Sequence, residues 1–244
     1  MKRGFFVFGD INSKDHNIYI SAGGTFDMAE PEYETVQIPG RNGDILVKSD
    51  RFSNIELSYP AFTFATNRAE FRRKMTDIRS ALGSQSGYQR LWDSYNPEEY
   101  RLAIFKGGIS TKPVAHVKAG EFDIEFECKP QRFLIEGEEE ISLTAAGQIF
   151  NPTLFASKPL IVVSGTGTLG IGSYSVAVVG ATGLDTYIDC DLMDAYTISG
   201  GVKTSRNGYV TTGTYFPELK PGANNIALGS GITKVVIIPR WWTL

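Results

Sequence analysis

Histidine and cysteine are scarce in this sequence, with two of each among 244 residues. His16 and His116 lie in separate polar stretches, so a zinc site would need carboxylate or cysteine ligands collected from distant segments, and surface histidines are the expected interpretation. Cys128 and Cys190 are far apart, and each lies in an apolar pattern typical of a strand. The sequence therefore predicts buried thiols in a reducing compartment, and it allows but does not require a disulfide between them.

Long apolar runs and an excess of basic charge are also absent. No run approaches the ~20 apolar residues that a membrane-spanning helix needs. The basic start Met1-Lys2-Arg3 is followed by an apolar run too short for a signal peptide, and residues 4–10 are predicted to form a first strand instead. Lysine and arginine total 24 against 27 aspartate and glutamate, a net charge of -3. The sequence thus predicts no signal-directed secretion, no membrane span and no tight nucleic-acid binding.

Signatures of enzymes are missing too. No Walker loop, HExxH, Cys-x-x-Cys or Gly-x-Ser-x-Gly pattern occurs. Residues Gly165-Thr166-Gly167-Thr168-Leu169-Gly170 match the dinucleotide fingerprint, but the next residues along the chain indicate a turn and a strand, not the helix that would hold a pyrophosphate. We expect a hairpin loop there, and we expect no enzymatic activity, no catalytic residues, no cofactor and no metal.

Length and composition favour two globular domains. At 244 residues with 42% apolar and 21% charged residues, the chain exceeds the usual size of a single core and has an ordinary soluble composition. Residues 1–135 read as strands with one helix, and the charged residues 136–140 read as a linker. Residues 141–244 contain about seven short strand patterns separated by turn residues, which indicates an antiparallel sandwich or barrel.

The one helix is predicted near residues 67–82. Asn67 is a suitable N-cap, Glu70 can reach back to complete a capping box, and Gly83 is expected to end the helix. Its apolar face consists of Phe71, Met75, Ile78 and Leu82. Its polar face consists of Arg68, Arg72, Arg73, Asp77 and Arg79. That face is expected to be solvated, with contact to a partner as the alternative.

A protruding hairpin is predicted in the first domain. Two strand patterns, residues 35–38 and 45–47, flank a turn that contains Arg41, Asn42, Gly43 and Asp44, and Asn-Gly is a favoured pair for hairpin turns. Further along, the apolar residues change parity around Pro60, which predicts a bulge or an edge position there.

Four carboxylates alternate with apolar residues over 121–128. Glu121, Asp123, Glu125 and Glu127 share one face of a predicted strand. A catalytic pair needs one carboxylate in a distinct apolar setting, and nothing separates these four, so a solvated surface is the favoured interpretation. Trp92 and the pair Trp241-Trp242 could stack on sugars if exposed, although core or interface positions are more frequent for such residues.

Several stretches, taken together and in order, resemble the distal tail protein family of long-tailed bacteriophages. They are Ile38-Pro39-Gly40-Arg41-Asn42-Gly43-Asp44, Glu127-Cys128-Lys129-Pro130-Gln131-Arg132-Phe133, Asn151-Pro152-Thr153, Ser157-Lys158-Pro159-Leu160-Ile161, the Gly165 turn, Ile188-Asp189-Cys190, Phe216-Pro217-Glu218-Leu219 and Pro239-Arg240-Trp241-Trp242. They span nearly the whole chain, and the ordered set is more specific than any single motif.

The resemblance implies a mainly β protein with a tail-tube-like split β-barrel carrying one α-helix, followed by a galectin-like antiparallel β-sandwich. It implies a structural role in the virion tail: a ring, usually a hexamer, that joins the tail tube protein to the tail-tip or receptor-binding proteins of the baseplate. DNA would pass through the ring without sequence readout, and assembly would occur in the host cytoplasm. The turn at Arg41, Asn42, Gly43 and Asp44 is a candidate contact between subunits of such a ring.

Two functions from other classes remain alternatives. A β-sandwich with tryptophans is compatible with a carbohydrate-binding module that aids recognition of the host cell wall. A cell-wall hydrolase is the other, although no local signature of one is present.

Overall fold

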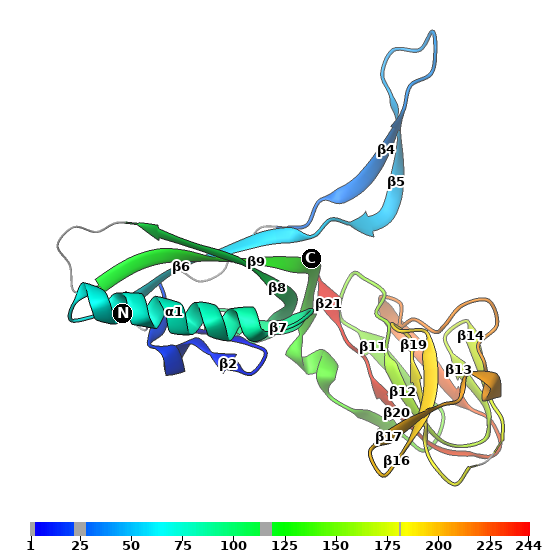
Figure 1. Ribbon diagram of the computed structural model, residues 1–244. Helices are drawn as coiled ribbons and strands as arrows, with labels where there is room; N and C mark the ends of the chain where they lie inside the picture. Colours follow the sequence, from blue (N-terminus) through cyan, green and yellow to red (C-terminus); the bar gives the residue numbers. More distant parts are fainter. Residues whose placement is uncertain (1–2, 22–27, 113–118, 181) are drawn as a thin grey trace. The chain divides into compact units, whose positions relative to one another are not determined.

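The computed structural model describes residues 3–21, 28–112, 119–180 and 182–244, and it divides the chain into two compact units. Unit 1 comprises residues 1–132 with Leu244, and unit 2 comprises residues 133–243 (Figure 1). Each unit has its own cluster of buried apolar side chains, as expected for two separately packed domains.

Unit 1 is built from strands and a single described α-helix. Its elements are β1 (Phe6–Phe8), β2 (Ile11–Asn12), the 3-10 helix η1 (Ser13–His16), β3 (Ile18–Ile20), β4 (Pro31–Val36), β5 (Ile45–Phe52), β6 (Ile55–Phe64), α1 (Arg68–Ser84), β7 (Gln89–Asp93), β8 (Glu99–Lys112) and β9 (Ala119–Leu134). The strands form a curled sheet in the order β2-β1-β7-β8-β9-β6-β3. An isolated bridge between Gly4 and Ile20 links the segment before β1 to the far edge strand β3, so the sheet curls most of the way toward a barrel.

The core of unit 1 lies between this sheet and α1. Side chains at every second position of β9, from Phe122 to Cys128, are at most 1% exposed, which confirms the alternation read from the sequence. Met75, Ile78 and Leu82 of α1 belong to the same buried cluster. Fully burying an aliphatic side chain contributes about 1.5–3 kcal/mol, so this shared face is what holds the helix on the sheet.

The predicted start of the helix is confirmed, and its predicted end is not. Asn67 caps the helix by accepting a hydrogen bond from the Glu70 amide at 2.9 Å. Hydrogen bonds from the side chain and backbone of Thr66, followed by Lys74, lower the pKa of Glu70 to about 2. The helix continues through Gly83 to Ser84, because Gly83 keeps a helical backbone and has no positive φ.

The predicted bulge at Pro60 is wrong, whereas the edge alternative is not overturned, because the pairing of β6 with β3 covers residues 61–63 and begins just after Pro60. Strand β6 pairs with β9 from Ile55 to Phe64 without a register shift, and it pairs on its other side with β3. Leu57, Tyr59 and Ala61 face the core on one parity throughout. Phe62 and Phe64 instead lie on the opposite face, where they contact each other edge to face at 5.5 Å. The apolar residues that seemed to change parity, Phe62 and Phe64, therefore form an aromatic pair on the outer face of β6.

Unit 2 is an antiparallel sandwich. Its elements are η2 (Ile135–Glu138), β10 (Ile141–Leu143), β11 (Gly147–Asn151), β12 (Leu160–Gly165), β13 (Gly167–Ile171), β14 (Tyr174–Val178), β15 (Thr186–Asp189), β16 (Asp194–Ser199), β17 (Val202–Ser205), η3 (Asn207–Tyr209), β18 (Val210–Thr211), β19 (Gly222–Leu228), β20 (Ile232–Ile238) and β21 (Trp242–Thr243). One sheet has the order β10-β20-β12-β15-β16-β17 and the other β11-β19-β13-β14-β18. Their inner faces supply the buried cluster, so the predicted sandwich is confirmed.

The charged segment at residues 136–140 begins as a 3-10 helix. Gly137 is buried, and its carbonyl accepts a hydrogen bond from the Arg240 amide at 2.7 Å. The division between the units falls between residues 132 and 133, ahead of this segment.

The loop at Gly165 is not the hairpin loop that the sequence predicts. Strands β12 and β13 belong to different sheets, so Thr166 crosses from one layer of the sandwich to the other. The hairpin is the next turn, where β13 pairs with β14 around Gly172. A Cβ atom on Gly165 would lie 2.1 Å from the Gly231 carbonyl oxygen, so the glycine allows two backbones to pass closely. The chain continues into β13 and not into a helix, and a dinucleotide site is excluded here.

Candidate interaction surfaces and a buried polar cluster

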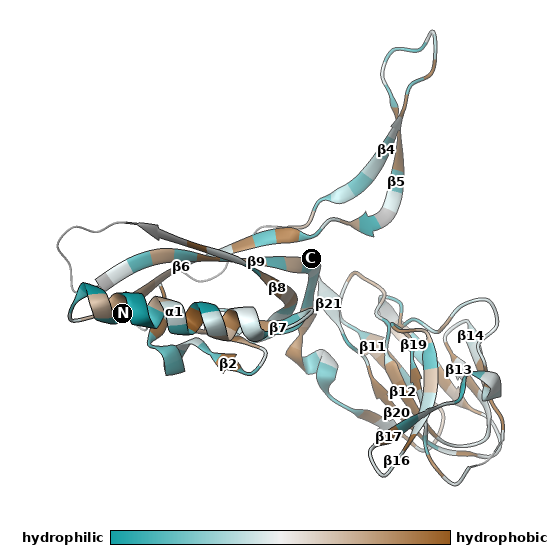
Figure 2. Cartoon of the chain, in the orientation of Figure 1, coloured by the Kyte–Doolittle hydropathy of each residue, from teal (hydrophilic) through white to brown (hydrophobic). Residues whose placement is uncertain are grey.

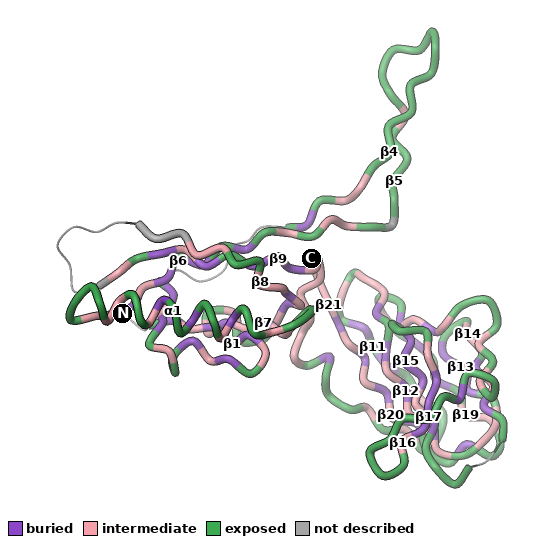
Figure 3. Tube along the Cα trace, viewed as in Figure 1, coloured by how far each residue is buried: buried purple, intermediate pink, exposed green. Residues whose placement is uncertain are grey.

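The β4–β5 hairpin forms a two-stranded sheet of its own within unit 1. Figure 3 shows it exposed along most of its length. Apolar residues nevertheless lie on both of its faces: Tyr33 and Leu46 are 52% and 63% exposed on one face, and Val36 and Val47 are 41% and 49% exposed on the other. Figure 2 shows hydrophobic and hydrophilic residues mixed along the two strands. A two-stranded ribbon has little stability of its own in water. Exposed apolar residues on such a ribbon make it a candidate contact surface.

The predicted contact residues occupy the tip of this hairpin. Arg41, Asn42, Gly43 and Asp44 are all exposed within the loop of residues 37–44 that joins the two strands. Gly40 and Gly43 have φ values of 84° and 82°, but Asn42 has no positive φ. The Asn42-Gly43 pair is therefore not a two-residue type I′ turn, which needs positive φ at both positions. The predicted strand at residues 45–47 lies within β5, whereas the one at residues 35–38 overlaps β4 only at Thr35 and Val36, so the connection is longer than the sequence indicates.

The four carboxylates of β9 do share one face, as predicted. Glu121 and Glu125 are exposed, whereas Asp123 and Glu127 are partly buried. Glu127 is the most engaged, because Lys106 forms an ion pair with it and the Asn54 amide donates to it at 2.8 Å. The facing strand β6 adds Glu56 directly opposite Glu127. None of the four carboxylates is buried, so none has the distinct apolar setting that a catalytic pair needs.

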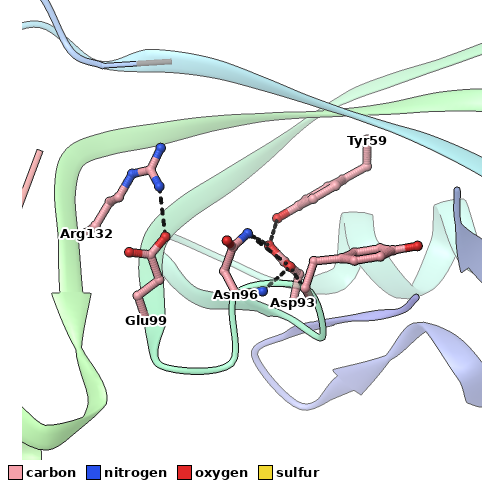
Figure 4. Close-up of polar contacts among 6 residues, drawn as sticks. Tyr59, Asp93, Asn96, Glu99 and Arg132 are labelled. Atoms are coloured by element: carbon pink, nitrogen blue, oxygen red, sulfur yellow. Dashed lines mark hydrogen bonds and ion pairs between the residues drawn. The ribbon is translucent and has the colours of Figure 1, made fainter. Parts of the chain in front are cut away.

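A buried polar cluster lies where β7 ends, around Asp93. Its carboxylate is 7% exposed and accepts a hydrogen bond from the Tyr59 hydroxyl at 2.8 Å and from the backbone amides of Tyr95 and Asn96 at 2.9 and 3.0 Å (Figure 4). Burial, and then the neighbouring Asp93, raise the pKa of Tyr59 well above its usual value. Tyr59 thus stays a neutral donor, and the cluster fixes the turn after β7 against β6.

Two arginines complete this region. Arg132 donates to Glu99 at 2.9 Å (Figure 4), while Arg101 on β8 is 7% exposed. Burial, followed by the like charge of Arg132, lowers the pKa of Arg101. Both arginines, Asp93 and Glu99 line one small cavity of about 20 Å³. The sequence analysis did not identify this cluster. Arg101 nevertheless lies two residues from buried Ala103 and so faces the same side of β8. A charged residue at such a core-facing position of a strand can be recognised from the sequence.

The other sequence candidates do not come together. His16 is partly buried in η1, and His116 lies outside the described residues. Within the described ranges, no group of three or more histidine, cysteine, aspartate or glutamate side chains could hold a metal ion. Cys128 and Cys190 are both free thiols. In the part of the chain that the structure describes, no helix is long and apolar enough to cross a membrane.

The tryptophans are engaged within their own units. Trp92 contacts Phe5 edge to face at 5.5 Å and donates to the Pro97 carbonyl at 3.1 Å. Trp241 is 4% exposed, and Trp242 stacks on Phe155 at 4.4 Å while donating to the Ala156 carbonyl at 2.9 Å. The tryptophans are therefore packed within their own units, in agreement with the interpretation favoured from the sequence over stacking on sugars.

Comparison with known families matches part of unit 1. Residues 11–128 match the phage tail protein RIFT-related domain. Among curated proteins, no relative matches this sequence.

Comparison with solved structures extends the likeness to both units. The Dit (gp 19.1) protein of phage SPP1, described as a paradigm of the hub adsorption apparatus in phages that infect Gram-positive bacteria, superposes with a TM-score of 0.74. The match is 14% identical in sequence and covers 100% of each chain. A chain of the phage p2 baseplate in its activated conformation with Sr gives a TM-score of 0.51 at 8% identity, covering 96% of this chain and 97% of that one. At these identities the likeness concerns the fold.

Proposed function

We propose that this chain is a siphophage distal tail protein that forms the hub between tail tube and baseplate, because residues 11–128 match a phage tail protein RIFT-related domain and both units share the fold of SPP1 Dit. The observation that carries the proposal is the coverage of the SPP1 Dit match, which includes both units in one chain. A tail protein of this fold is a structural component of the virion. A ring, the contacts between its subunits and the nature of its lumen are the finer parts of the proposal.

The proposed assembly is a closed ring, a hexamer by resemblance to the family. A ring of identical subunits needs head-to-tail contacts between two different patches on each subunit. The β4–β5 hairpin supports this arrangement, because its exposed apolar residues on both faces need a partner surface that the described part of its own unit does not provide. We propose that a neighbouring subunit covers it, with Arg41, Asn42, Gly43 and Asp44 at the contact.

The acidic face of β9 is proposed to line the lumen. Glu121 and Glu125 are exposed on it, and DNA carries a negative charge at every phosphate. A lumen of the same sign repels the DNA backbone and keeps it from adhering during passage. No base-specific contact is required for this role. The tail tube protein on one side and tail-tip or receptor-binding proteins on the other are the proposed partners, and the host cytoplasm is the proposed place of assembly.

Native mass spectrometry of the purified protein, alone and mixed with the tail tube protein of the same phage, tests the ring. We expect a discrete closed oligomer, with six copies as the predicted number, in at least one of the two samples. Antibody labelling of virions in the electron microscope gives the position, expected at the junction of tube and baseplate. A monomer in both samples together with label elsewhere on the virion would contradict the proposal.

The carbohydrate-binding alternative gains no support from the described aromatic residues. Trp241 is buried, and Trp92 and Trp242 each pack against a phenylalanine ring of their own unit. Binding of cell-wall glycans by the purified protein would restore that alternative.

A further inference from the structure

A groove lies between the C-terminal half of α1 and strand β8. Its volume of about 570 Å³ is within the ~300–1,000 Å³ typical of ligand-binding clefts, so several side chains of a partner fit into it. Gly83 in its wall is not a left-handed cap, because it has no positive φ, and a Cβ atom there would meet no described atom within 4 Å. A glycine within a helix is less favourable than alanine, so Gly83 keeps the groove open while weakening α1. The groove is lined by Thr76, Arg79, Ser80, Gly83, Phe105, Lys106 and Gly107.

A row of exposed arginines continues the helical wall of this groove. Arg68, Arg72 and Arg79 are separated by four and seven residues, so they share one side of α1. Arg68 and Arg72 are like charges one turn apart, and such pairs destabilise a helix. No acidic residue lies three or four positions from any of the three, whereas Lys74 is paired with Glu70 at 3.0 Å. The row therefore carries positive charge that α1 itself does not neutralise.

One face of the β4–β5 hairpin has a complementary composition. Glu34 lies opposite Val47 in the strand pairing, and Val36 lies opposite Ile45, so these four side chains share one face, the Glu34 face. Glu34 is exposed, and Val36 and Val47 are 41% and 49% exposed. The Glu34 face thus presents one carboxylate among three β-branched apolar side chains. Such a surface complements a groove that combines a cation with an apolar wall.

Arg79 and Phe105 provide these two features in the groove. Lys106, the other cation of the groove, is already paired with Glu127. Arg79 is exposed and makes no ion pair with any residue in the described ranges. Phe105 is only partly buried against the core of unit 1, and it also lines the groove. The groove therefore offers a bidentate donor for a carboxylate and an aromatic wall for aliphatic side chains.

We propose that the Glu34 face of one copy docks into the α1–β8 groove of a second copy of this chain, with Glu34 paired to Arg79. Val36 and Val47 then pack near Phe105. Hairpin and groove are two different patches of one chain, which is what a closed ring requires. A second copy is the occupant because the hairpin carries both the carboxylate and the apolar side chains that complement the groove. The inference rests on the proposed hub function and adds to it the surface that receives the hairpin.

Crosslinking of cysteine variants tests the docking directly. The native thiols, Cys128 and Cys190, are free and buried, so a short bismaleimide reacts only with introduced cysteines. We expect the chain with Val36→Cys and Ser80→Cys to give a series of covalent oligomers, either alone or mixed with the tail tube protein of the same phage. The matched control carries Ser80→Cys with Val202→Cys, because Val202 is 65% exposed in unit 2. This control should remain monomeric on denaturing gels.

Charge reversal tests the proposed ion pair. Glu34→Arg and Arg79→Glu should each weaken self-association about tenfold or more in sedimentation velocity, because each places like charges in contact. The double variant, which carries both changes, should recover association. Lys234→Glu is the control for Arg79→Glu, because Lys234 is exposed in unit 2 and its change alters the net charge equally. Circular dichroism checks that each variant is folded, and if a charge variant does not fold, the crosslink decides.

Failure of the docking and failure of the hub function give different results. A closed oligomer in native mass spectrometry without the crosslink between Val36→Cys and Ser80→Cys would overturn the docking and leave the hub proposal standing. Folded single charge variants that associate like the wild type, or a double variant that does not recover, would also overturn the docking. Monomers both with and without the tail tube protein would overturn the docking together with the ring.

Discussion

Cys128 and Cys190 each lie in the core of their own unit, at 0% and 2% exposure. Burial raises the pKa of both thiols to about 12, so neither forms the reactive thiolate near neutral pH. We expect no reaction of the native protein with Ellman's reagent at pH 8 and two thiols per chain after denaturation. Cys128→Ser should leave one thiol in denaturant. Fast labelling of the native protein would contradict this interpretation.

The raised pKa of the two thiols also makes the free energy of unfolding depend on pH. Because the folded pKa lies above the unfolded value of 9.0, the unfolded chain loses its thiol protons first as the pH rises. The stability associated with the neutral thiols is complete below about pH 9 and is lost as the pH approaches about 12. The pKa of Asp189 shifts in the opposite direction, because this carboxylate has a charged partner.

Asp189 and Arg240 form a bidentate pair in unit 2, with N–O distances of 2.8 and 2.9 Å. Burial alone would raise the pKa of Asp189, but hydrogen bonds from Arg240 and then from the Leu192 and Asp191 amides lower it overall. Asp189→Asn leaves Arg240 without its counter-charge. Breaking such a pair costs on the order of 3 kcal/mol, with less expected here because Arg240 is partly exposed. Urea unfolding of the variant measures the loss.

The control for this pair is the double variant Asp189→Asn with Arg240→Met, which removes both charges. It should recover part of the loss, because no unpaired charge remains. In the wild type, the contribution of the pair should be present above the unfolded aspartate pKa of 3.8 and should be lost as the pH falls through the lower folded value. A single variant as stable as the wild type would show that the pair contributes nothing.

At the level of elements, the proposed contact at the β4–β5 hairpin predicts that assembly can be weakened without loss of folding stability. Leu46 and Val47 lie on its opposite faces and are 63% and 49% exposed, so replacing both by serine removes little packing within the subunit. We expect the free energy of unfolding to stay within about 0.5 kcal/mol of the wild type. Self-association should weaken about tenfold or more, as losing ~1.4 kcal/mol of contact energy implies. Sedimentation velocity and urea unfolding measure the two effects.

Leu192 and Val202 of unit 2 provide the matched comparison, at 68% and 65% exposure. Serine at both positions removes similar apolar surface away from the hairpin and should leave association unchanged. Hairpin variants that assemble like the wild type would exclude the hairpin as a contact.

The sequence predicts helices and strands whose signals lie in neighbouring residues, but it does not predict which strands pair with one another. The Asn67 cap and the alternation from Phe122 to Cys128 depend on neighbouring residues only, so both predictions are confirmed. The predicted bulge at Pro60 and the predicted hairpin loop at Gly165 were wrong because each depends on which distant strand lies alongside. Arg101 was missed although its parity with Ala103 could be read from the sequence, because which face of β8 is buried depends on how the sheet curls around the core.

For the whole molecule, the proposal that the acidic face of β9 lines the lumen makes a prediction about DNA passage. Phage carrying Glu121→Lys and Glu125→Lys should eject DNA more slowly, because a basic lumen attracts phosphates that the native surface repels. The delay should shrink as salt is raised, since screening weakens the attraction over distances beyond about 8–10 Å at physiological ionic strength. Ejection triggered in vitro and followed by a DNA-binding dye at several salt concentrations measures both effects.

Glu139→Lys with Glu140→Lys is the control, because it changes the net charge by the same amount at exposed positions outside β9. If the β9 carboxylates line the lumen, only the first variant slows ejection, and both variants assemble normally. Equal ejection by the two variants and the wild type would mean that this face does not meet the DNA. The ring could still form through the hairpin, since the β9 carboxylates are not needed for the contacts proposed there.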